Sequence, residues 1–349
     1  MKKKPTKKKR SETLYRVAPS QANQTLTTAL REWLPQSPSW GQLRRLVGTR
    51  RVLVNGNVCV DAARRLKLTD VVRVLEHPAA PPAREDDVRV AYLDSQIVVV
   101  EKPSGMTSVR HALEKQWPTK RKEEQPTLED LLPRIIAKKQ SGGRGVQQRG
   151  GERRGARGAN PPSRTPPVRP VHRLDRETSG VMIFARTVPA ERHLGEQFRK
   201  HTTERRYLAI VEGAIAAQRI ESQLVRDRGD GRRGSTEMEG VGKTAVTHVR
   251  PLESFDGCTL VECRLETGRT HQIRIQLSEL GHPVCGDKVY GRAKSDEGQR
   301  IGAPRLALHA ESLTFEHPHS GEQMTFRMPL PADLKQFLDR LRHKKMPPT

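Results

Sequence analysis

The chain has 349 residues, enough for one large folded core and a small second domain, and its 64 Lys and Arg against 40 acidic residues give a net charge of +24. Such an excess of positive charge predicts a polyanionic partner. No apolar run approaches the ~18 residues of a membrane span, and no apolar segment follows the basic start as in a secretory signal. We therefore expect a cytoplasmic protein, although a polybasic start can also be a nuclear or organellar address.

The charge is unevenly spread. Residues 2–10 hold seven basic residues and no acidic one, and residues 138–170 hold nine basic residues and one acidic one. These two segments carry fifteen of the twenty-four charges, so the remainder of the chain is only moderately basic. We expect residues 1–18 to be a disordered basic tail.

Residues 19–76 are predicted to form a compact unit. Two short helices are indicated by apolar residues at helical spacing, at Leu26, Leu30, Trp33 and Leu34 and again at Leu43, Leu46 and Val47. A strand with an Asn-Gly hairpin turn follows over 50–58, and a further strand over 68–74. This succession resembles the S-four-type RNA-binding module. The resemblance implies that Arg44, Arg45, Arg50 and Arg51 meet phosphate; the alternative is a basic helical hairpin that binds nothing.

Residues 77–87 are a proline-rich linker, and a second, larger domain is expected over 88–342. Within it, residues 138–168 are rich in Gly, Arg, Ser and Pro and nearly lack large apolar residues, which predicts a disordered insertion. Strands are expected at 97–100, 181–185, 207–211 and 260–265, several of them apolar on both faces and therefore central. Leu194 and Phe198 mark one helix. Thr270 is expected to cap another, which ends at Gly281.

The nine residues HRLDRETSG (172–180) place a carboxylate, Asp175, between Arg173 and Arg176, directly before an apolar strand. Flanking cations favour the ionised form of a carboxyl group, which keeps it available as a base or nucleophile. On chemistry alone, however, an Asp between arginines is more often a surface ion pair.

A family resemblance favours the catalytic interpretation. HRLDRETSG resembles the catalytic motif of the RluA-like pseudouridine synthases, which isomerise uridine in structured RNA. Five further segments resemble the family in the same order, and together they span about 220 residues. They are IVVVEKPSGM (97–106), RRYLAIVEG (205–213), ETGRTHQIRIQL (266–277), GHPVCGDKVYG (281–291) and RLALHAESLTFEHP (305–318).

The resemblance implies a mixed α/β (α+β) catalytic domain with a central, largely antiparallel sheet and flanking helices. It implies that Asp175 is the essential carboxylate, that Tyr207 packs on the uracil ring and helps proton removal at C5, and that Arg269 pairs with Asp175. Arg173 would help to hold the flipped-out nucleotide, or else form a salt bridge to Glu177. Lys102 and Arg176 are further candidates for RNA contact, and Arg269 at a helix start could instead face RNA phosphate.

Pseudouridine formation breaks the bond from C1′ to N1, turns the base and rejoins C1′ to C5, so it needs no cofactor. We expect a monomer that acts on large-subunit ribosomal RNA, with tRNA as the alternative substrate. A protein that keeps the fold as an inactive ribosome assembly factor, or a carboxylate-dependent glycosidic-bond hydrolase, is a less favoured hypothesis.

The remaining chemistry-bearing residues do not indicate a metal site. Cys59, Cys258, Cys263 and Cys285 show no CxxC spacing and no nearby Cys/His ligand set, which predicts buried free thiols. His172 and His271 are expected to be structural hydrogen-bonding residues rather than metal ligands.

Overall fold

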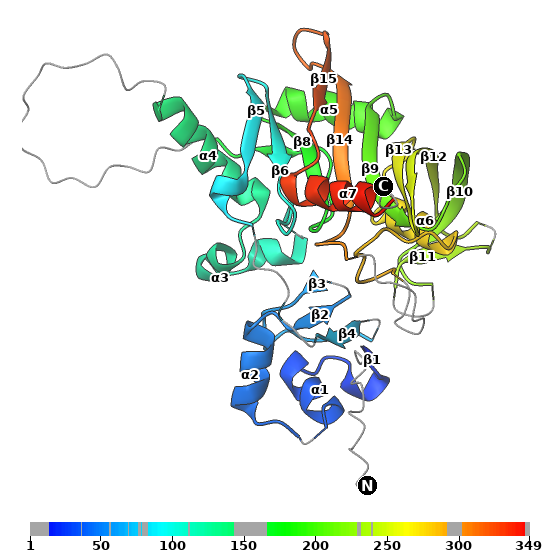
Figure 1. The fold of residues 1–349 in the computed structure, drawn as a ribbon. Coiled ribbons are helices and arrows are strands. Elements are labelled where there is room, and N and C mark those ends of the chain that lie inside the picture. The colour runs from blue at the N-terminus through cyan, green and yellow to red at the C-terminus, as the bar shows by residue number, and fades with distance from the viewer. Residues whose placement is uncertain are drawn as a thin grey trace, which may run out of the picture. The chain divides into compact units, whose positions relative to one another are not determined.

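The computed structural model describes residues 14–35, 37–55, 57–68, 70–75, 78, 83–110, 112–142, 166–228, 232–238, 240–291 and 302–345. The chain divides into two compact units (Figure 1). One consists of residues 1–81 and 222–243, and the other of residues 82–221 and 244–349. No described helix is long and apolar enough to cross a membrane.

The first unit contains the two helices and the hairpin that the sequence predicts. Helix α1 (Leu26–Trp33) and helix α2 (Trp40–Gly48) pack beside a sheet in the order β1-β4-β2-β3, formed by β1 (Leu14–Arg16), β4 (Val71–Val74), β2 (Val52–Val54) and β3 (Asn57–Val58). A short 3-10 helix, η1 (Pro19–Gln21), precedes α1. Side chains of Thr25 and Ser39 accept hydrogen bonds from the first turns of α1 and α2, which fixes where each helix begins. Asn55 takes the left-handed conformation, with φ of 52°, in the β2–β3 turn.

The prediction of a disordered tail over residues 1–18 is wrong for its last part. Leu14 to Arg16 pair with β4 as an edge strand, and Val17 is buried. Leu14 and Tyr15 are only partly exposed, so the apolar residues of the tail contribute to the sheet. Residues 1–13 lie outside the described part of the chain.

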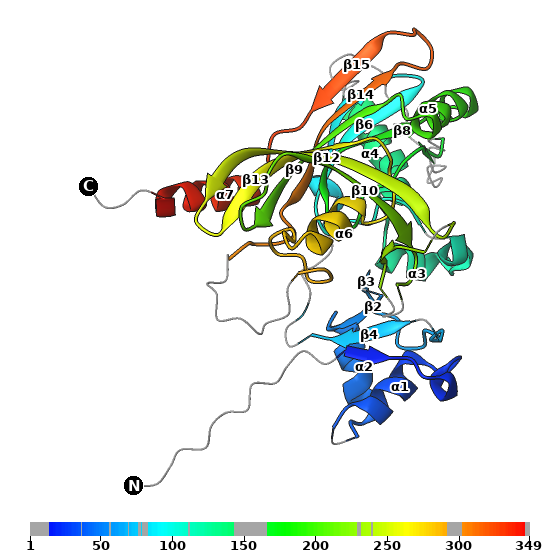
Figure 2. The same cartoon turned by 90° about the vertical axis from the view of Figure 1, so that its right-hand side faces the viewer.

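A large mixed sheet has the strand order β11-β10-β12-β13-β9-β14-β8-β6-β5 (Figure 2). The second unit is built on this sheet, except that β11 and the end of β10, from Ser222, are grouped with the first unit. Strands β14 and β8 pair in parallel. The pairs β10–β11, β12–β13, β13–β9, β9–β14, β14–β15, β8–β6, β6–β5 and β7–β8 are antiparallel. The strands are β5 (Arg89–Leu93), β6 (Ile97–Lys102), β8 (Ser179–Ala185), β9 (Glu204–Glu212), β10 (Gln218–Val225), β11 (Gly234–Thr236), β12 (Lys243–Phe255), β13 (Cys258–Leu265) and β14 (Leu308–Glu316), with β7 (Arg169–Pro170) paired to β8 and β15 (Gln323–Arg327) to β14. The four strands predicted from sequence correspond to β6, β8, β9 and β13, all in the interior of the sheet. The expected fold class is therefore confirmed.

Helices cover the sheet in two groups, each with its own apolar core. Helices α4 (Leu128–Gly142) and α5 (Val188–Lys200) pack with β6 and β8. Helices α6 (Gln272–Glu279) and α7 (Ala332–Lys345) pack with β9 and β13. The shorter elements are η2 (Glu85–Asp87), η3 (Ala112–Gln116) and α3 (Thr119–Glu124).

Three boundaries differ from the prediction. Residues 138–142 belong to α4 and Val168 is buried, so the expected insertion is narrower than 138–168, and 143–165 lie outside the described residues. The end of the expected linker forms η2, where Glu85 pairs with Lys138 of α4 at 2.7 Å. The N-cap of α6 is His271 rather than Thr270.

Candidate active site

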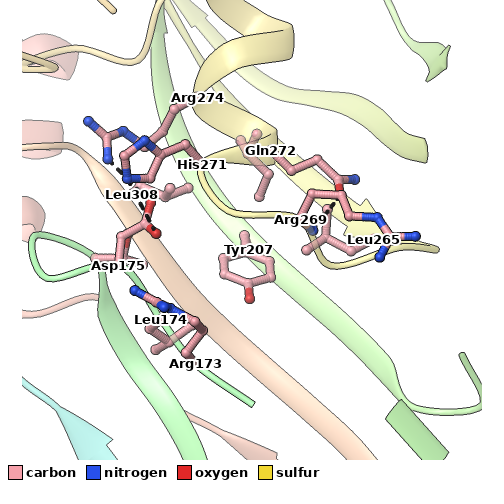
Figure 3. Close-up of a pocket in the computed structure, with 12 residues that line it drawn as sticks. Arg173, Leu174, Asp175, Tyr207, Leu265, Arg269, His271, Gln272, Arg274 and Leu308 are labelled. Atoms are coloured by element: carbon pink, nitrogen blue, oxygen red, sulfur yellow. Dashed lines mark hydrogen bonds and ion pairs between the residues drawn. The ribbon is translucent and has the colours of Figure 1, made fainter. Parts of the chain in front are cut away.

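Asp175 lies in the loop that leads into β8, on the wall of a cleft in the second unit. The cleft combines side chains from that loop, from β9, β13 and β14, and from the start of α6 (Figure 3). Its lining residues are Arg173, Leu174, Asp175, Thr178, Tyr207, Leu265, Arg269, His271, Gln272, Ile273, Arg274 and Leu308. The structure thus brings Asp175, Tyr207, Arg269 and Arg173 together, as the sequence predicts.

Two side chains of the α6 region contact the Asp175 carboxylate. Arg274 donates from Nη1 to Oδ2 at 3.3 Å, and His271 Nε2 lies 3.8 Å from Oδ1. Burial by itself would raise the pKa of Asp175, but it is outweighed by the His271 imidazole in its protonated form, by the charge and hydrogen bond of Arg274 and by the charge of Arg173, which together hold this pKa below its usual value. Asp175 is therefore a carboxylate at neutral pH in a site from which most water is excluded.

Arg274 is itself fixed by a second carboxylate. It donates from Nε and Nη2 to the two oxygens of Asp287, at 2.7 and 2.9 Å, and the Asp287 side chain is fully buried. Backbone N–H groups of Val289 and Tyr290 also donate to Asp287. A bidentate pair of this kind orients the planar guanidinium, so one of its nitrogens is presented to Asp175.

The predicted pairing of Arg269 with Asp175 is wrong. Arg269 donates from Nε to the backbone oxygen of Thr244 at 3.0 Å, and its guanidinium points away from Asp175 (Figure 3). The partner of Asp175 is Arg274, five residues further along the same segment. A signal for it was available: Arg274 stands between Ile273 and Ile275, and an arginine within an apolar run needs a buried anion.

Tyr207 lies on β9, where its backbone pairs with Cys263 of β13 and Ala310 of β14. Its ring occupies the middle of the cleft, between Asp175 and Arg269 (Figure 3). Burial, aided by the nearby Asp175 charge and opposed by Arg205, raises the pKa of Tyr207 to about 12. The hydroxyl is therefore protonated at neutral pH, and the residue offers a flat, largely apolar face to a base.

The RNA contact expected of Lys102 is not supported, because its side chain is fully buried. Its ammonium donates to the backbone oxygens of Pro103 and Met106, both at 2.9 Å, and of Arg176 at 3.1 Å. Burial, partly offset by the charges of Glu177 and Asp175, lowers the pKa of Lys102 to about 7.

Lys102 is part of a set of hydrogen bonds between two loops. Ser104 donates to the oxygen of Glu177 and Ser108 to that of Leu174, both at 2.7 Å. Arg176, another expected RNA contact, donates from Nε to the oxygen of Gly105 at 3.0 Å and is largely buried. We call residues 102–108, which supply Lys102, Ser104, Gly105 and Ser108 to these hydrogen bonds, the clamp segment. It holds the loop that carries Asp175.

Arg173 behaves differently from Arg176. Its side chain is exposed at the cleft, and the ion pair of Glu177 is formed with Arg176, at 3.7 Å, rather than with Arg173. The alternative role expected of Arg173, a salt bridge to Glu177, is therefore filled by Arg176. The exposed guanidinium remains available to a ligand.

The four arginines expected to bind phosphate in the first unit are not equivalent. Arg44 and Arg45 are exposed on α2. Arg50 takes a left-handed conformation with φ of 63°. Arg51 donates from Nε to the backbone oxygen of Leu75 at 3.1 Å, which joins the residue before β2 to the residue after β4.

No metal-binding cluster of His, Cys, Asp or Glu occurs among the described residues, and the four cysteines are buried free thiols. His172 has the structural role expected of it. Its Nε2 accepts a hydrogen bond from the backbone of Ile183 at 3.0 Å, and its ring stacks on Phe198. Burial, together with the charge of Arg205, lowers the pKa of His172 to about 3, so it is neutral.

Comparison with known proteins decides the family. A sequence profile described as RNA pseudouridylate synthase matches residues 96–279, which include Asp175, Tyr207 and Arg274. The chain belongs to the RNA pseudouridylate synthase family. It is 35% identical to ribosomal large subunit pseudouridine synthase D of Zymomonas mobilis over 82% of this chain and 84% of that protein. It is 34% identical to the uncharacterized RNA pseudouridine synthase YlyB of Bacillus subtilis over 86% and 89%.

Solved structures of family members share the fold. Human RNA pseudouridylate synthase domain containing 4 superimposes with a TM-score of 0.53 at 24% identity, covering 72% of this chain and 92% of that one. Human RNA pseudouridylate synthase domain containing 1 gives a TM-score of 0.51 at 24% identity, covering 77% and 100%. As a family member the protein is an RNA pseudouridine synthase, an isomerase.

Proposed function

We propose that this pseudouridine synthase isomerises specific uridines of large-subunit ribosomal RNA and that Asp175 is the essential carboxylate. The observation that carries the reaction chemistry is the ionised, buried Asp175 held by Arg274 on the wall of the cleft. The substrate follows from the relatives, since the Zymomonas mobilis protein, similar over most of the chain, is named for the ribosomal large subunit.

The cleft has what the isomerisation requires. An ionised carboxylate at the ribose serves both attack at C1′ and removal of the C2′ proton. The Tyr207 ring and the side chains of Leu265 and Leu308 form apolar walls on which a uracil ring can pack. Because Arg274 holds Asp175 in place, the sugar can stay beside this carboxylate while the uracil ring turns against the apolar walls.

The target nucleotide must leave its stack to reach the cleft, at a cost of a few kcal/mol. Arg173, exposed at the cleft, is suited to contact the RNA backbone of the extruded nucleotide. Arg44 and Arg45 of the first unit supply further exposed positive charge for phosphates. We expect the protein to act as a monomer in the cytoplasm, where bacterial ribosomes are assembled.

The test is pseudouridine mapping on total RNA from cells that carry the wild-type protein or Asp175→Asn. Loss of discrete sites in large-subunit ribosomal RNA supports the proposal. Loss confined to tRNA would keep the reaction and overturn the substrate. If no uridine changes, the protein is a binding factor and the proposed activity is wrong.

A further inference from the structure

His271 sits at a point where backbone strain, a hydrogen bond and an ion pair coincide. It has φ of 61° and ψ of 17°, in the left-handed region that is unfavourable for a residue with a side chain. Its side chain lines the cleft and faces Asp175 (Figure 3). Strain of this kind persists only where the surrounding structure enforces it, and it concentrates at functional sites.

The imidazole is held from both ends. Nδ1 lies 2.8 Å from the Tyr290 hydroxyl, with the two rings edge to face at 5.5 Å between centroids. Nε2 lies 3.8 Å from Oδ1 of Asp175. A phenolic hydroxyl can either donate or accept, so Tyr290 can satisfy Nδ1 whichever ring nitrogen carries the proton. The ring can therefore gain and lose a proton at Nε2 without losing its partner.

The isomerisation requires such a group. When C5 has bonded to C1′, it still carries its hydrogen, and that proton must leave before the aromatic base is restored. The acceptor must lie at the cleft and must exchange protons near neutral pH.

Most of the described side chains that line the cleft cannot serve. The aliphatic side chains, the Gln272 amide and the Thr178 hydroxyl are not bases at neutral pH, and the arginines are always protonated. Tyr207 keeps its proton because burial raises its pKa to about 12, and Asp175 is a weak base because its pKa is held low. Histidine is the side-chain type suited to proton exchange at neutral pH.

We propose that His271 is a second catalytic residue, the base that takes the proton from C5 of the rejoined uracil. This rests on the proposed function. In the step, the C5–H bond breaks, its electron pair forms the C5=C6 double bond, and the N1=C6 pair returns to N1. Nε2 of His271 takes the proton, water supplies one to N1, and the imidazolium later returns its proton to water. No oxidant or donor is consumed.

The surroundings favour the transfer. Among the described residues, the charged and titratable groups near the imidazole include Asp175 from the loop before β8, Arg274 of α6 and Tyr290 of the following turn, with Arg173 also near Asp175. Asp175, freed when the sugar is rejoined, stabilises the imidazolium at 3.8 Å, while Arg274 remains paired with Asp287.

The experiment uses His271→Asn, because asparagine tolerates the left-handed conformation. Single-turnover rates are measured on a ribosomal RNA substrate carrying either hydrogen or deuterium at C5 of the target uridine. We expect the rate to fall by ~10²-fold, the scale of a lost general base. We also expect the isotope effect of the variant to exceed that of the wild-type enzyme, because C5–H cleavage becomes rate-limiting. A merely structural role slows the reaction without raising the isotope effect.

His271→Gly gives an independent measurement, since glycine suits φ of 61° and leaves room for added imidazole. Free imidazole should restore its rate and lower its isotope effect. Tyr207→Phe is the matched comparison for the competing hydroxyl, and its isotope effect should stay at the wild-type value.

An isotope effect that rises in Tyr207→Phe and stays at the wild-type value in folded His271→Asn overturns the assignment of His271 alone. So does a folded His271→Gly variant that imidazole does not rescue. If the wild-type enzyme releases no C5 hydrogen from ribosomal RNA or tRNA, the proposed function itself is wrong, and the assignment of His271 is wrong with it.

Discussion

Arg274 approaches Asp175 with only one of its nitrogens, Nη1 at 3.3 Å from Oδ2. The other two donate to Asp287, which is fully buried. The two aspartates therefore share one cation, and the orientation of the reactive one depends on the pairing of the other.

This sharing makes Arg274→Met informative. Loss of the guanidinium removes a charge that lowers the pKa of Asp175, so this pKa rises and the acid limb of the pH–rate profile moves to higher pH. Asp287 is left as a buried, unpaired charge, which costs ~3–5 kcal/mol of the free energy of unfolding. Thermal unfolding and pH–rate profiles measure the two effects.

The double variant Arg274→Met/Asp287→Asn is the control, because it removes the unpaired charge. It should recover much of the stability without recovering activity. Full activity in the double variant would contradict a role for Arg274 in orienting Asp175.

Lys102 should give the protein an unusual pH dependence. Its pKa of about 7 in the folded protein lies below the ordinary value of 10.5, so between these values the unfolded chain binds more protons than the folded one. Stability therefore rises as the pH increases from about 7 toward 10, by at most ~1.4 kcal/mol per unit. Urea unfolding of the wild-type protein and of Lys102→Met across this range measures it. Equal slopes for the two proteins would contradict the prediction.

Gly180 is a position where any side chain should be severely destabilising. It has φ of 122°, and a Cβ atom would lie 2.2 Å from the backbone oxygen of Ala310 on the neighbouring strand. The new Cβ would meet main-chain atoms of Ala310, which pairs with Gly180 between two central strands and cannot move aside easily. Gly180→Ala should therefore lower the free energy of unfolding by ~4 kcal/mol or more.

Gly195→Ala in α5 is the matched control. Its Cβ would meet only the end of the Arg199 side chain at 3.5 Å, so alanine should stabilise the helix by ~0.5–1 kcal/mol. If both variants unfold at the same denaturant concentration, the close approach of β8 and β14 is not as the structure has it.

Thr178 carries a buried hydroxyl without a hydrogen-bond partner among the described residues, and it lines the cleft. A buried hydroxyl without a partner is unfavourable, so the nearly isosteric Thr178→Val should raise the free energy of unfolding by ~1 kcal/mol. Chemical denaturation of the free protein measures this. A decrease would mean that the hydroxyl has a partner in solution.

The sequence predicted the large elements because their signals are local. The apolar runs that became β6, β8, β9 and β13, and the Asn55 turn, are set by alternation and turn chemistry over a few residues. The tail was misjudged because Leu14 to Arg16 gain their order from pairing with β4, nearly sixty residues later, which no local pattern shows.

Side-chain direction accounts for the errors within the site. Arg269 and Arg274 are both arginines of one motif, and only the start of α6 at Gln272, after a left-handed His271, decides which of them faces Asp175. From its residue type, Lys102 is expected at the surface, yet at the end of β6 its side chain points inward and donates to main-chain carbonyl groups. The inward direction of Lys102 does not follow from residue type or spacing, whereas that of Arg274 is indicated only by its place between Ile273 and Ile275.

The hydrogen bonds between the clamp segment and the loop that carries Asp175 depend on side chains mainly in the clamp segment. On the catalytic loop the acceptors are main-chain oxygens of Leu174, Arg176 and Glu177, which any residue at those positions would supply. The donors are the side chains of Lys102, Ser104 and Ser108, 66 to 74 residues earlier in the chain. The conformation that presents Asp175 therefore depends largely on side chains of another segment. On the loop itself, Arg176 is the residue next to Asp175 whose side chain joins these contacts, by donating to Gly105.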